Sequence, residues 1–149
     1  MNHVFDTSVI IKGILKPRRK KQDSILKEQF RVHKIATSFM NKIYSGKINL
    51  IIPSAALIEI AAVSSRLTGV KDTSIKTTNF INSISTVINE SDILDQCIDV
   101  AAETKISGFD AVFIAVAKLT NSTLITDDKK MYESATKLSV DSKLLRDIK

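Results

Sequence analysis

Residues 4–15 of the chain, VFDTSVIIKGIL, hold the pattern that decides the fold. Two apolar residues, Val4 and Phe5, come before Asp6, and a longer apolar run follows it. The first stretch indicates a short strand over residues 3–6, and the run after it indicates a helix over 7–15. Because an unpaired carboxylate is costly to bury, Asp6 either caps that helix or takes part in chemistry. Its position at the junction leaves both interpretations open.

Strands alternate with helices along the rest of the chain. The apolar stretches that indicate strands lie at 49–53, 84–88 and 123–126, and the tail from Ser139 is expected to add an edge strand. Helical periodicity, with Ser54 and Ser91 as start signals, predicts helices at 24–45, 54–67, 72–83, 91–105, 109–120 and 129–138. This alternation predicts an α/β fold, a three-layer α/β/α sandwich with a central, mainly parallel sheet. We expect a single domain over residues 1–149, because four Gly and two Pro leave little room for linkers.

Composition excludes several classes of protein. The chain of 149 residues is 44% hydrophobic and 26% charged, which is ordinary for a globular protein. Its longest apolar run, 111–117, is far shorter than the roughly 20 residues that a membrane span needs. The start lacks the pattern of a signal peptide, and a single cysteine excludes an internal disulfide. We therefore expect a cytoplasmic protein with no membrane partner. In the helix at 91–105, the residues expected to face inward are Ile93, Leu94, Cys97, Ile98 and Ala101.

The positive charge is concentrated at one end of the chain. Residues 1–50 hold 11 Lys and Arg against 3 Asp and Glu, whereas residues 51–149 hold 11 against 13. The densest basic run is KPRRKK at 16–21, and the candidates for contact with nucleic-acid phosphates are Arg18, Arg19, Lys20 and Lys21. The same run could instead bind an acidic protein partner or remain a solvated segment. Charge alone does not decide among these roles.

Four acidic residues stand apart from the other charges. Asp6 and Asp128 each follow a strand and precede a helix, and Asp110 lies in the first turn of a helix. Capping and the helix dipole explain each of these three on its own. Glu59 differs, because its helix is apolar nearly all round and no Lys or Arg lies within four residues of it. Unless it reaches the surface near the helix start, such a glutamate needs a partner.

Taken together, the four acids predict a metal site. In a parallel sheet the strand-to-helix junctions share one edge, which would bring all four carboxylates into one cleft. There they would raise one another's pKa values, and two charges roughly 4 Å apart repel by about 4 kcal/mol at an effective permittivity of about 20. Oxygen ligands without a nearby His or Cys suit Mg²⁺ or Mn²⁺. Such an ion beside a basic surface indicates hydrolysis of a nucleic-acid phosphodiester.

The order of these motifs resembles the PIN-domain nucleases, and within them the VapC-type toxins and related archaeal PIN proteins. The motifs are FDTSV, the isolated glutamate after a strand ending in proline, SGFDAVFIAVAK and TLITDDKKM, and they extend over nearly the whole chain. The resemblance implies metal-dependent cleavage of RNA, frequent homodimers and, for toxins, an antitoxin protein that blocks the site. It places the family's four acids on Asp6, Glu59, Asp110 and Asp128. The outer-shell candidates that it adds are Thr7, Thr126 and Asp127.

Two alternatives to a toxin ribonuclease stay open. The basic segment and the long helix after it are longer than in many compact VapC toxins, so an RNA-processing PIN protein also fits. A non-catalytic PIN-like module could bind RNA or a protein partner through the basic N-terminal part. The two histidines, His3 and His33, do not indicate acid–base cleavage, because His33 lies in mid-helix among basic residues. Acids at 92, 95, 99 and 103 recur at helical spacing and indicate a solvated face.

Overall fold

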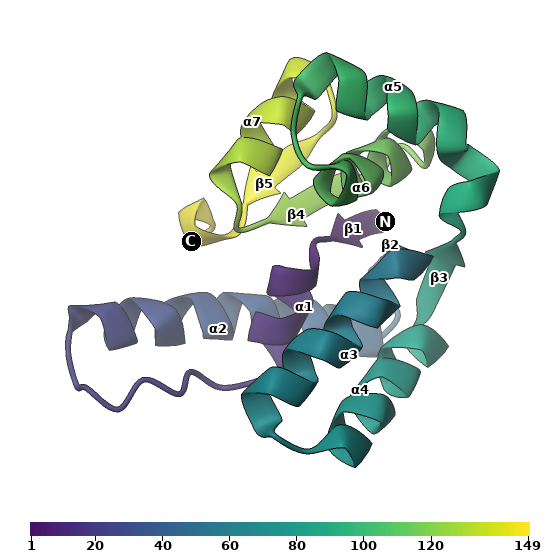
Figure 1. Ribbon diagram of the computed structural model, residues 1–149. Helices are drawn as coiled ribbons and strands as arrows, with labels where there is room; N and C mark the ends of the chain where they lie inside the picture. The colour runs from purple at the N-terminus through teal and green to yellow at the C-terminus, as the bar shows by residue number, and fades with distance from the viewer.

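The computed structural model describes residues 1–149 and has a five-stranded, all-parallel sheet flanked by helices (Figure 1). The strands are β1 (Asn2–Phe5), β2 (Asn49–Pro53), β3 (Ser85–Ile88), β4 (Thr123–Thr126) and β5 (Ser142–Leu144). The helices are α1 (Thr7–Ile14), α2 (Ser24–Tyr44), α3 (Ser54–Thr68), α4 (Lys71–Ile84), α5 (Leu94–Thr104), α6 (Gly108–Leu119) and α7 (Lys129–Lys137). Two 3-10 turns are η1 (Glu90–Ile93) and η2 (Leu145–Asp147). The predicted α/β class and parallel sheet are confirmed.

β1 lies at the centre of the sheet, whose strand order is β3-β2-β1-β4-β5. Val4 on β1 is opposite Ile51 on β2 and Leu124 on β4, in parallel register on both sides. The three central strands are largely buried because helices cover both faces of the sheet, and 31 buried hydrophobic residues form the core. Since all strands run the same way, the residues that follow β1, β2 and β4 emerge at one edge.

α1 and α2 approach each other closely at Gly13. A Cβ on Gly13 would lie 2.6 Å from Met40 Cγ and 3.1 Å from a backbone carbonyl oxygen of α2. The Thr37 hydroxyl donates to the Gly13 carbonyl oxygen at 3.2 Å. His33 Nδ1 lies 2.6 Å from the Lys12 carbonyl oxygen, so α2 satisfies carbonyls that the end of α1 leaves free. This crossing requires glycine for space, and it gives His33 a structural contact.

The first half of α2 and the connection before it extend away from the sheet as an arm (Figure 1). The connection, residues 15–23, has no regular secondary structure. Asp23 caps α2 by accepting from the Leu26 amide at 3.0 Å, and Arg19 donates to the same carboxylate. The basic run therefore lies on the arm. No helix in the chain combines the length and the apolar character that crossing a bilayer requires.

The start of α3 corrects one sequence prediction, because Ser54 is not its cap. Pro53 occupies the N-cap position without a side-chain bond. The Glu90 carboxylate, 36 residues from Ser54, accepts from the Ser54 hydroxyl and, at 2.6 Å, from the Ala55 amide. A carboxylate from η1 thus satisfies the first groups of α3 and lies at the positive end of its dipole.

α5 corrects a second prediction. Ser91 belongs to η1, and the α-helix itself begins at Leu94. Cys97 is buried as expected, but Leu94 and Ile98 are 55% and 57% exposed, so their inward assignment was wrong. The buried residues of this segment are Ile93, Cys97 and Val100. Ile93 and Cys97 each come one position before one of the two exposed residues. The acids at 92, 95, 99 and 103 are all exposed and form the solvated face that their spacing predicted.

Candidate functional site

Asp6 is buried at the carboxyl end of the central strand, with 8% of its surface exposed. It caps α1, because its Oδ1 accepts from the Ser8 amide at 2.9 Å. Its Oδ2 accepts from the hydroxyls of Ser8 and Thr126, at 2.9 and 2.7 Å. These donors hold the carboxylate in one orientation and leave one lone pair of Oδ1 free. Capping and a functional role are therefore compatible at this residue.

Thr126 and Asp128 form the β4 side of the same region. Thr126 is fully buried; its hydroxyl donates to Asp6 and accepts from the Asp128 amide at 3.0 Å. Asp128 caps α7 through Oδ1, which accepts from the Met131 amide at 2.9 Å. The exposed Asp128 carboxylate keeps Oδ2 available for another ligand. One hydroxyl thus links the two predicted site aspartates.

Glu59 lies in the second turn of α3. It is partly buried, and burial raises the pKa of its carboxyl above the ordinary value. The negative charges of Asp6 and Asp110 raise this pKa further, while Arg66 and the Thr7 hydroxyl act weakly in the opposite direction. Glu59 is therefore near enough to the two aspartates for their charges to affect its pKa.

Asp110 lies in the first turn of α6, where Ser107 is the cap. Burial raises the pKa of Asp110, and although Ser107 opposes this, the charges of Asp128 and Asp6 add to the increase. The expectation that these carboxylates would raise one another's pKa values is met at Glu59 and Asp110. Asp110 is therefore within electrostatic range of both Asp6 and Asp128.

This region fits a hard cation without forming a ready-made cage. No three Asp, Glu, His or Cys side chains lie close enough together to enclose an ion as they stand. All of the candidate ligand atoms are nevertheless oxygens, as a hard cation prefers. The surroundings of Glu59 and Asp110 disfavour the charged form of their carboxyls and raise both pKa values. The buried Thr7 hydroxyl has no well-aligned hydrogen-bond partner, although it is near enough to Glu59 to affect its pKa. A hydrated cation would neutralise the carboxylates, and one of its waters would give the Thr7 hydroxyl a hydrogen-bond partner.

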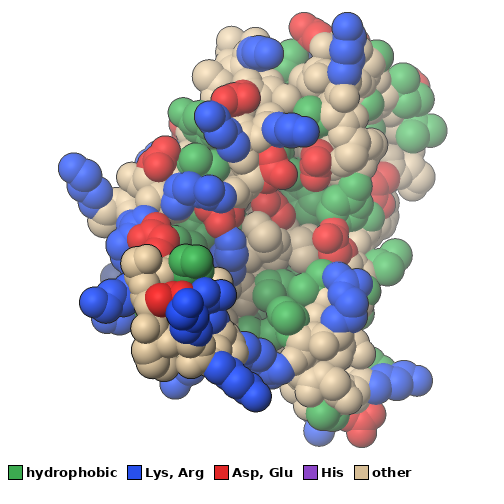
Figure 2. Space-filling view, turned by 60° about the vertical axis from the view of Figure 1, so that its left-hand side comes forward, with side chains coloured by type: hydrophobic (Ala, Val, Ile, Leu, Met, Phe, Trp, Pro, Cys, Tyr) green, Lys and Arg blue, Asp and Glu red, His purple; other side chains and the backbone are tan.

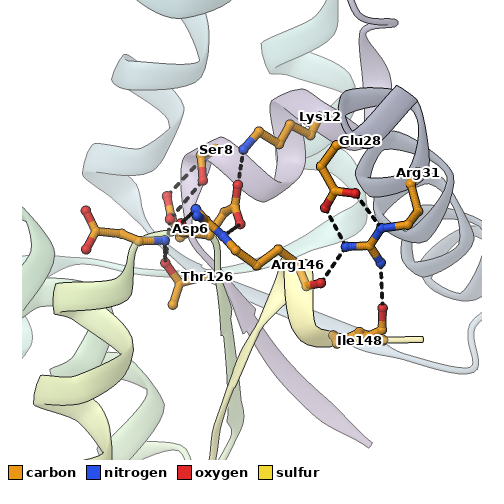
Figure 3. A network of polar contacts seen from close by, with 10 residues as sticks. Asp6, Ser8, Lys12, Glu28, Arg31, Thr126, Arg146 and Ile148 are labelled. Carbon is orange, nitrogen blue, oxygen red and sulfur yellow. Dashed lines mark hydrogen bonds and ion pairs between the residues drawn. The ribbon is translucent and has the colours of Figure 1, made fainter. Parts of the chain in front are cut away.

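Asp127 is turned toward two cations. Lys12, in the last turn of α1, and Arg146, in η2, both form ion pairs with its carboxylate (Figure 3). Arg146 also donates to the Asp127 carbonyl oxygen at 2.6 Å. Arg31 of α2 donates in turn to the carbonyl oxygens of Arg146 and Ile148. The arm, the C-terminal turn and the end of β4 are thereby joined by one polar network.

The four basic residues predicted for nucleic-acid contact do not act alike. Arg19 is bound by Asp23, whereas Arg18 lines a groove of about 190 Å³ between α1, the arm and the end of α3. Lys20 and Lys21 are exposed on the arm. Other residues that line the groove are Ile11, Lys12, Leu15, Lys16, Pro17, Gln29, His33 and Leu67. The basic run therefore offers both a groove-facing cation and outward-facing ones.

Acidic and basic side chains occupy separate areas on one face of the molecule. Figure 2 shows carboxylates gathered near the centre of a hollowed face, with Lys and Arg around them and most densely on the projecting arm. Apolar side chains line the lower part of the same hollow. An extended polyanion that crosses this face would meet positive charge on the way to the acids.

The comparisons with known proteins agree with this architecture. Residues 3–137 match the model of the PIN domain, so the chain belongs to the PIN-domain family. The family resemblance inferred from the motifs is thereby confirmed. No curated protein matches the chain.

Solved structures share the fold at low sequence identity. VapBC2 from Rickettsia felis, bound to a DNA fragment from its promoter, has a TM-score of 0.61 at 14% identity, with 96% of this chain and 98% of that chain covered. FitAB bound to an IR36 DNA fragment has a TM-score of 0.67 at 12% identity, with 99% and 97% covered. FitAcB from Neisseria gonorrhoeae has a TM-score of 0.53 at 14% identity, with 98% and 99% covered.

Sequence reasoning missed several residues that shape this region. Ser8 binds both oxygens of Asp6, and the Asp-Thr-Ser spacing, an aspartate two residues before a hydroxyl at a helix start, was an available signal. Lys12 and Arg146 meet at Asp127 across 115 and 19 residues of chain. No local pattern connects these pairs, so only the fold reveals them.

Proposed function

We propose that this PIN-domain protein is a divalent-metal-dependent endoribonuclease whose Mg²⁺ or Mn²⁺ is held by Asp6, Glu59, Asp110 and Asp128. The observation that carries the proposal is the electrostatic proximity of these carboxylates. Asp6 raises the pKa of both Glu59 and Asp110, and Asp128 raises that of Asp110. A divalent cation is the partner that such a group of charges lacks. PIN domains are generally nucleases, which agrees with this chemistry.

The chain's own residues would set the geometry of the reaction. Ser8 and Thr126 hold the Asp6 carboxylate, and Thr126 ties it to the Asp128 backbone. The free Thr7 hydroxyl is placed to hydrogen-bond a water molecule near Glu59. When bound, the ion would polarise a phosphoryl oxygen and lower the pKa of a coordinated water.

Substitution of two aspartates by asparagine tests the proposal. Asn keeps an oxygen acceptor for the capped amides, so Asp6→Asn and Asp128→Asn should fold while losing the charge that binds the ion. We expect wild-type protein to cleave RNA with Mn²⁺ and to stop with excess chelator, and both variants to be inactive. Asp99→Asn, on the exposed face of α5, is the matched control. Full activity in Asp6→Asn and Asp128→Asn would rule the proposal out.

The finer role that the fold neighbours support is a toxin paired with an antitoxin protein. VapBC2 and FitAB are named as such paired assemblies, each in complex with DNA. Growth arrest on expression of the wild-type chain, relieved by Asp6→Asn, is the expected result for a toxin. An RNA-processing enzyme would not arrest growth. A second copy of the chain is a further proposed partner, since Leu94 and Ile98 leave apolar surface exposed on α5.

A non-catalytic RNA-binding module is the competing function, and the basic arm is the observation that favours it. It requires RNA binding that chelator does not change and no cleavage in wild-type protein. Joint replacement of Arg18, Lys20 and Lys21 by glutamine should then lower the salt dependence of binding. Cleavage that disappears in the Asp6 variant would exclude this alternative.

A further inference from the structure

The cluster around Asp127 carries more positive charge than its one carboxylate can neutralise. Asp127 pairs with both Lys12 and Arg146, which leaves a net charge of +1. The Asp127 side chain is only 10% exposed, whereas those of Lys12 and Arg146 are 42% and 51% exposed. Glu28 nearby is paired with Arg31 and so adds no net charge. This cluster therefore presents a cation to the solvent.

The cluster around Asp127 is adjacent in sequence to two residues of the acidic region. Asp127 stands between Asp128 and Thr126, whose hydroxyl donates to Asp6 at 2.7 Å. Lys12 is on the helix that Asp6 caps, about 9 Å along its axis from Asp6. Lysine side chains on helices lean toward the N-terminus, which brings the Lys12 ammonium back toward the acids (Figure 3).

The two cations differ in their freedom to move. Arg146 donates to the carboxylate and to the carbonyl oxygen of Asp127, and its own carbonyl oxygen accepts from Arg31. Lys12 makes a single ion pair, and an ammonium group has three N–H donors. Arg146 is therefore held on two sides, while Lys12 keeps donors for another acceptor.

Lys12 also connects two hollows of the surface. It lines a pocket of about 200 Å³ together with Asp127 and Arg146, and it lines the groove that contains Lys16 and Arg18. A chain of phosphates bound along this groove would meet Lys12 as well as Lys16 and Arg18. Because carboxylates repel phosphate, a cation beside them contributes most to the binding of an anionic substrate.

We propose that Lys12 binds a phosphate of the RNA beside the acidic region, and that Asp127 and Arg146 are positioning residues that hold it there. This inference rests on the proposed cleavage of RNA at the four carboxylates. Its alternative is a purely structural ion pair, which is common among exposed charges. The two differ in whether Lys12 contributes to RNA binding.

Binding without cleavage is the first test. The probe is a fluorescein-labelled, single-stranded RNA of mixed sequence, titrated by anisotropy in EDTA at several salt concentrations. Lys12→Gln should lower the slope of log affinity against log salt by about 0.7, the value of one contact with a single-strand phosphate. Lys118→Gln makes the same charge change at an exposed residue in the last turn of α6 and should leave the slope unchanged. An unchanged slope in Lys12→Gln, or no binding by wild type in EDTA, overturns the inference.

Kinetics separate this inference from the proposed function. With Mn²⁺, Lys12→Gln should lower kcat/KM by about tenfold, as for loss of one charge-assisted contact, while Lys12→Arg retains most of it. The increase in melting temperature on adding Mn²⁺ should be equal in wild type and Lys12→Gln, because the ion site is intact. Cleavage by wild type with equal kcat/KM in Lys12→Gln would sink the inference alone. Absence of cleavage in wild type would sink the proposed function, whatever the binding slopes.

Discussion

Replacing Glu90 by alanine should destabilise the protein, although Glu90 belongs to none of the sequence motifs. Its carboxylate accepts from the Ser54 hydroxyl and the Ala55 amide at the start of α3. Loss of a helix cap costs about 0.5–2 kcal/mol, and hydrogen bonds to charged groups contribute about 1.5–3 kcal/mol. We expect the free energy of unfolding to fall by about 2 kcal/mol. For a chain of this length, that lowers the melting temperature by about 4–8 °C.

The pH dependence of this effect follows from the pKa of Glu90. Burial alone would raise that pKa, but the hydrogen bonds from Ala55 and Ser54 outweigh burial and lower it below the ordinary value. Because the folded-state pKa is depressed, the stabilisation is fully present above the unfolded-state pKa of about 4.3. It is lost as the pH falls through the lower, folded-state pKa. The difference between wild type and Glu90→Ala should therefore be constant near neutrality and shrink below about pH 4.

Urea denaturation followed by circular dichroism measures this difference at pH 7 and at acid pH. Glu103→Ala is the matched control, because Glu103 is exposed on α5 and makes no hydrogen bond to a helix start. It should unfold at the wild-type urea concentration. Glu90→Ala as stable as wild type at pH 7 would refute the reasoning, as would a deficit that stays undiminished in acid.

Two further predictions concern the core. Gly13→Ala should lower the free energy of unfolding by about 1–3 kcal/mol despite its better helix propensity, because the new Cβ would overlap Met40; an unchanged melting temperature would contradict this. Burial lowers the pKa of His3, and its Nδ1 has no hydrogen-bond partner. The folded state therefore favours the neutral imidazole, and the protein loses stability as the pH falls below about 6.5. Between pH 7 and 5 the unfolding free energy of wild type should fall more steeply than that of His3→Gln, and equal slopes would count against this account.

The fold could be predicted because its determinants are local. In VFDTSVIIKGIL the change from strand to helix is visible within a few residues, and the same change recurs after β2 and β4. Alternation of this kind permits few topologies once the crossovers are right-handed. In α5 the local pattern is not enough. Apolar residues lie on both sides of its buried stripe, so periodicity does not say which of them are buried. Packing against α6 decides that Cys97 is buried while Ile98 is exposed.

Two of the candidate acids could be selected for the same reason, since Asp6 and Asp128 stand at strand-to-helix junctions that a parallel sheet places at one edge. Glu59 and Asp110 lie on helices, and only their place in the motifs selects them. What could not be predicted are pairings between distant segments. Glu90 reaches the start of α3 from 36 residues beyond Ser54, and Arg146 reaches Asp127 from the C-terminal turn. Asp127 lies beside Asp128 in the chain, yet its side chain serves a different set of partners.

The central claim is that folding gathers Asp6, Glu59, Asp110 and Asp128 around a divalent cation. The most direct measurement is the melting temperature of metal-free wild type and of the double variant Glu59→Gln, Asp110→Asn, with and without Mn²⁺. At 100 times the dissociation constant, a specific ion stabilises the wild type by about 2.7 kcal/mol, or about 5–10 °C. The account predicts this increase in the wild type and its loss in the double variant. An increase of equal size in both proteins, or none in either, would contradict it.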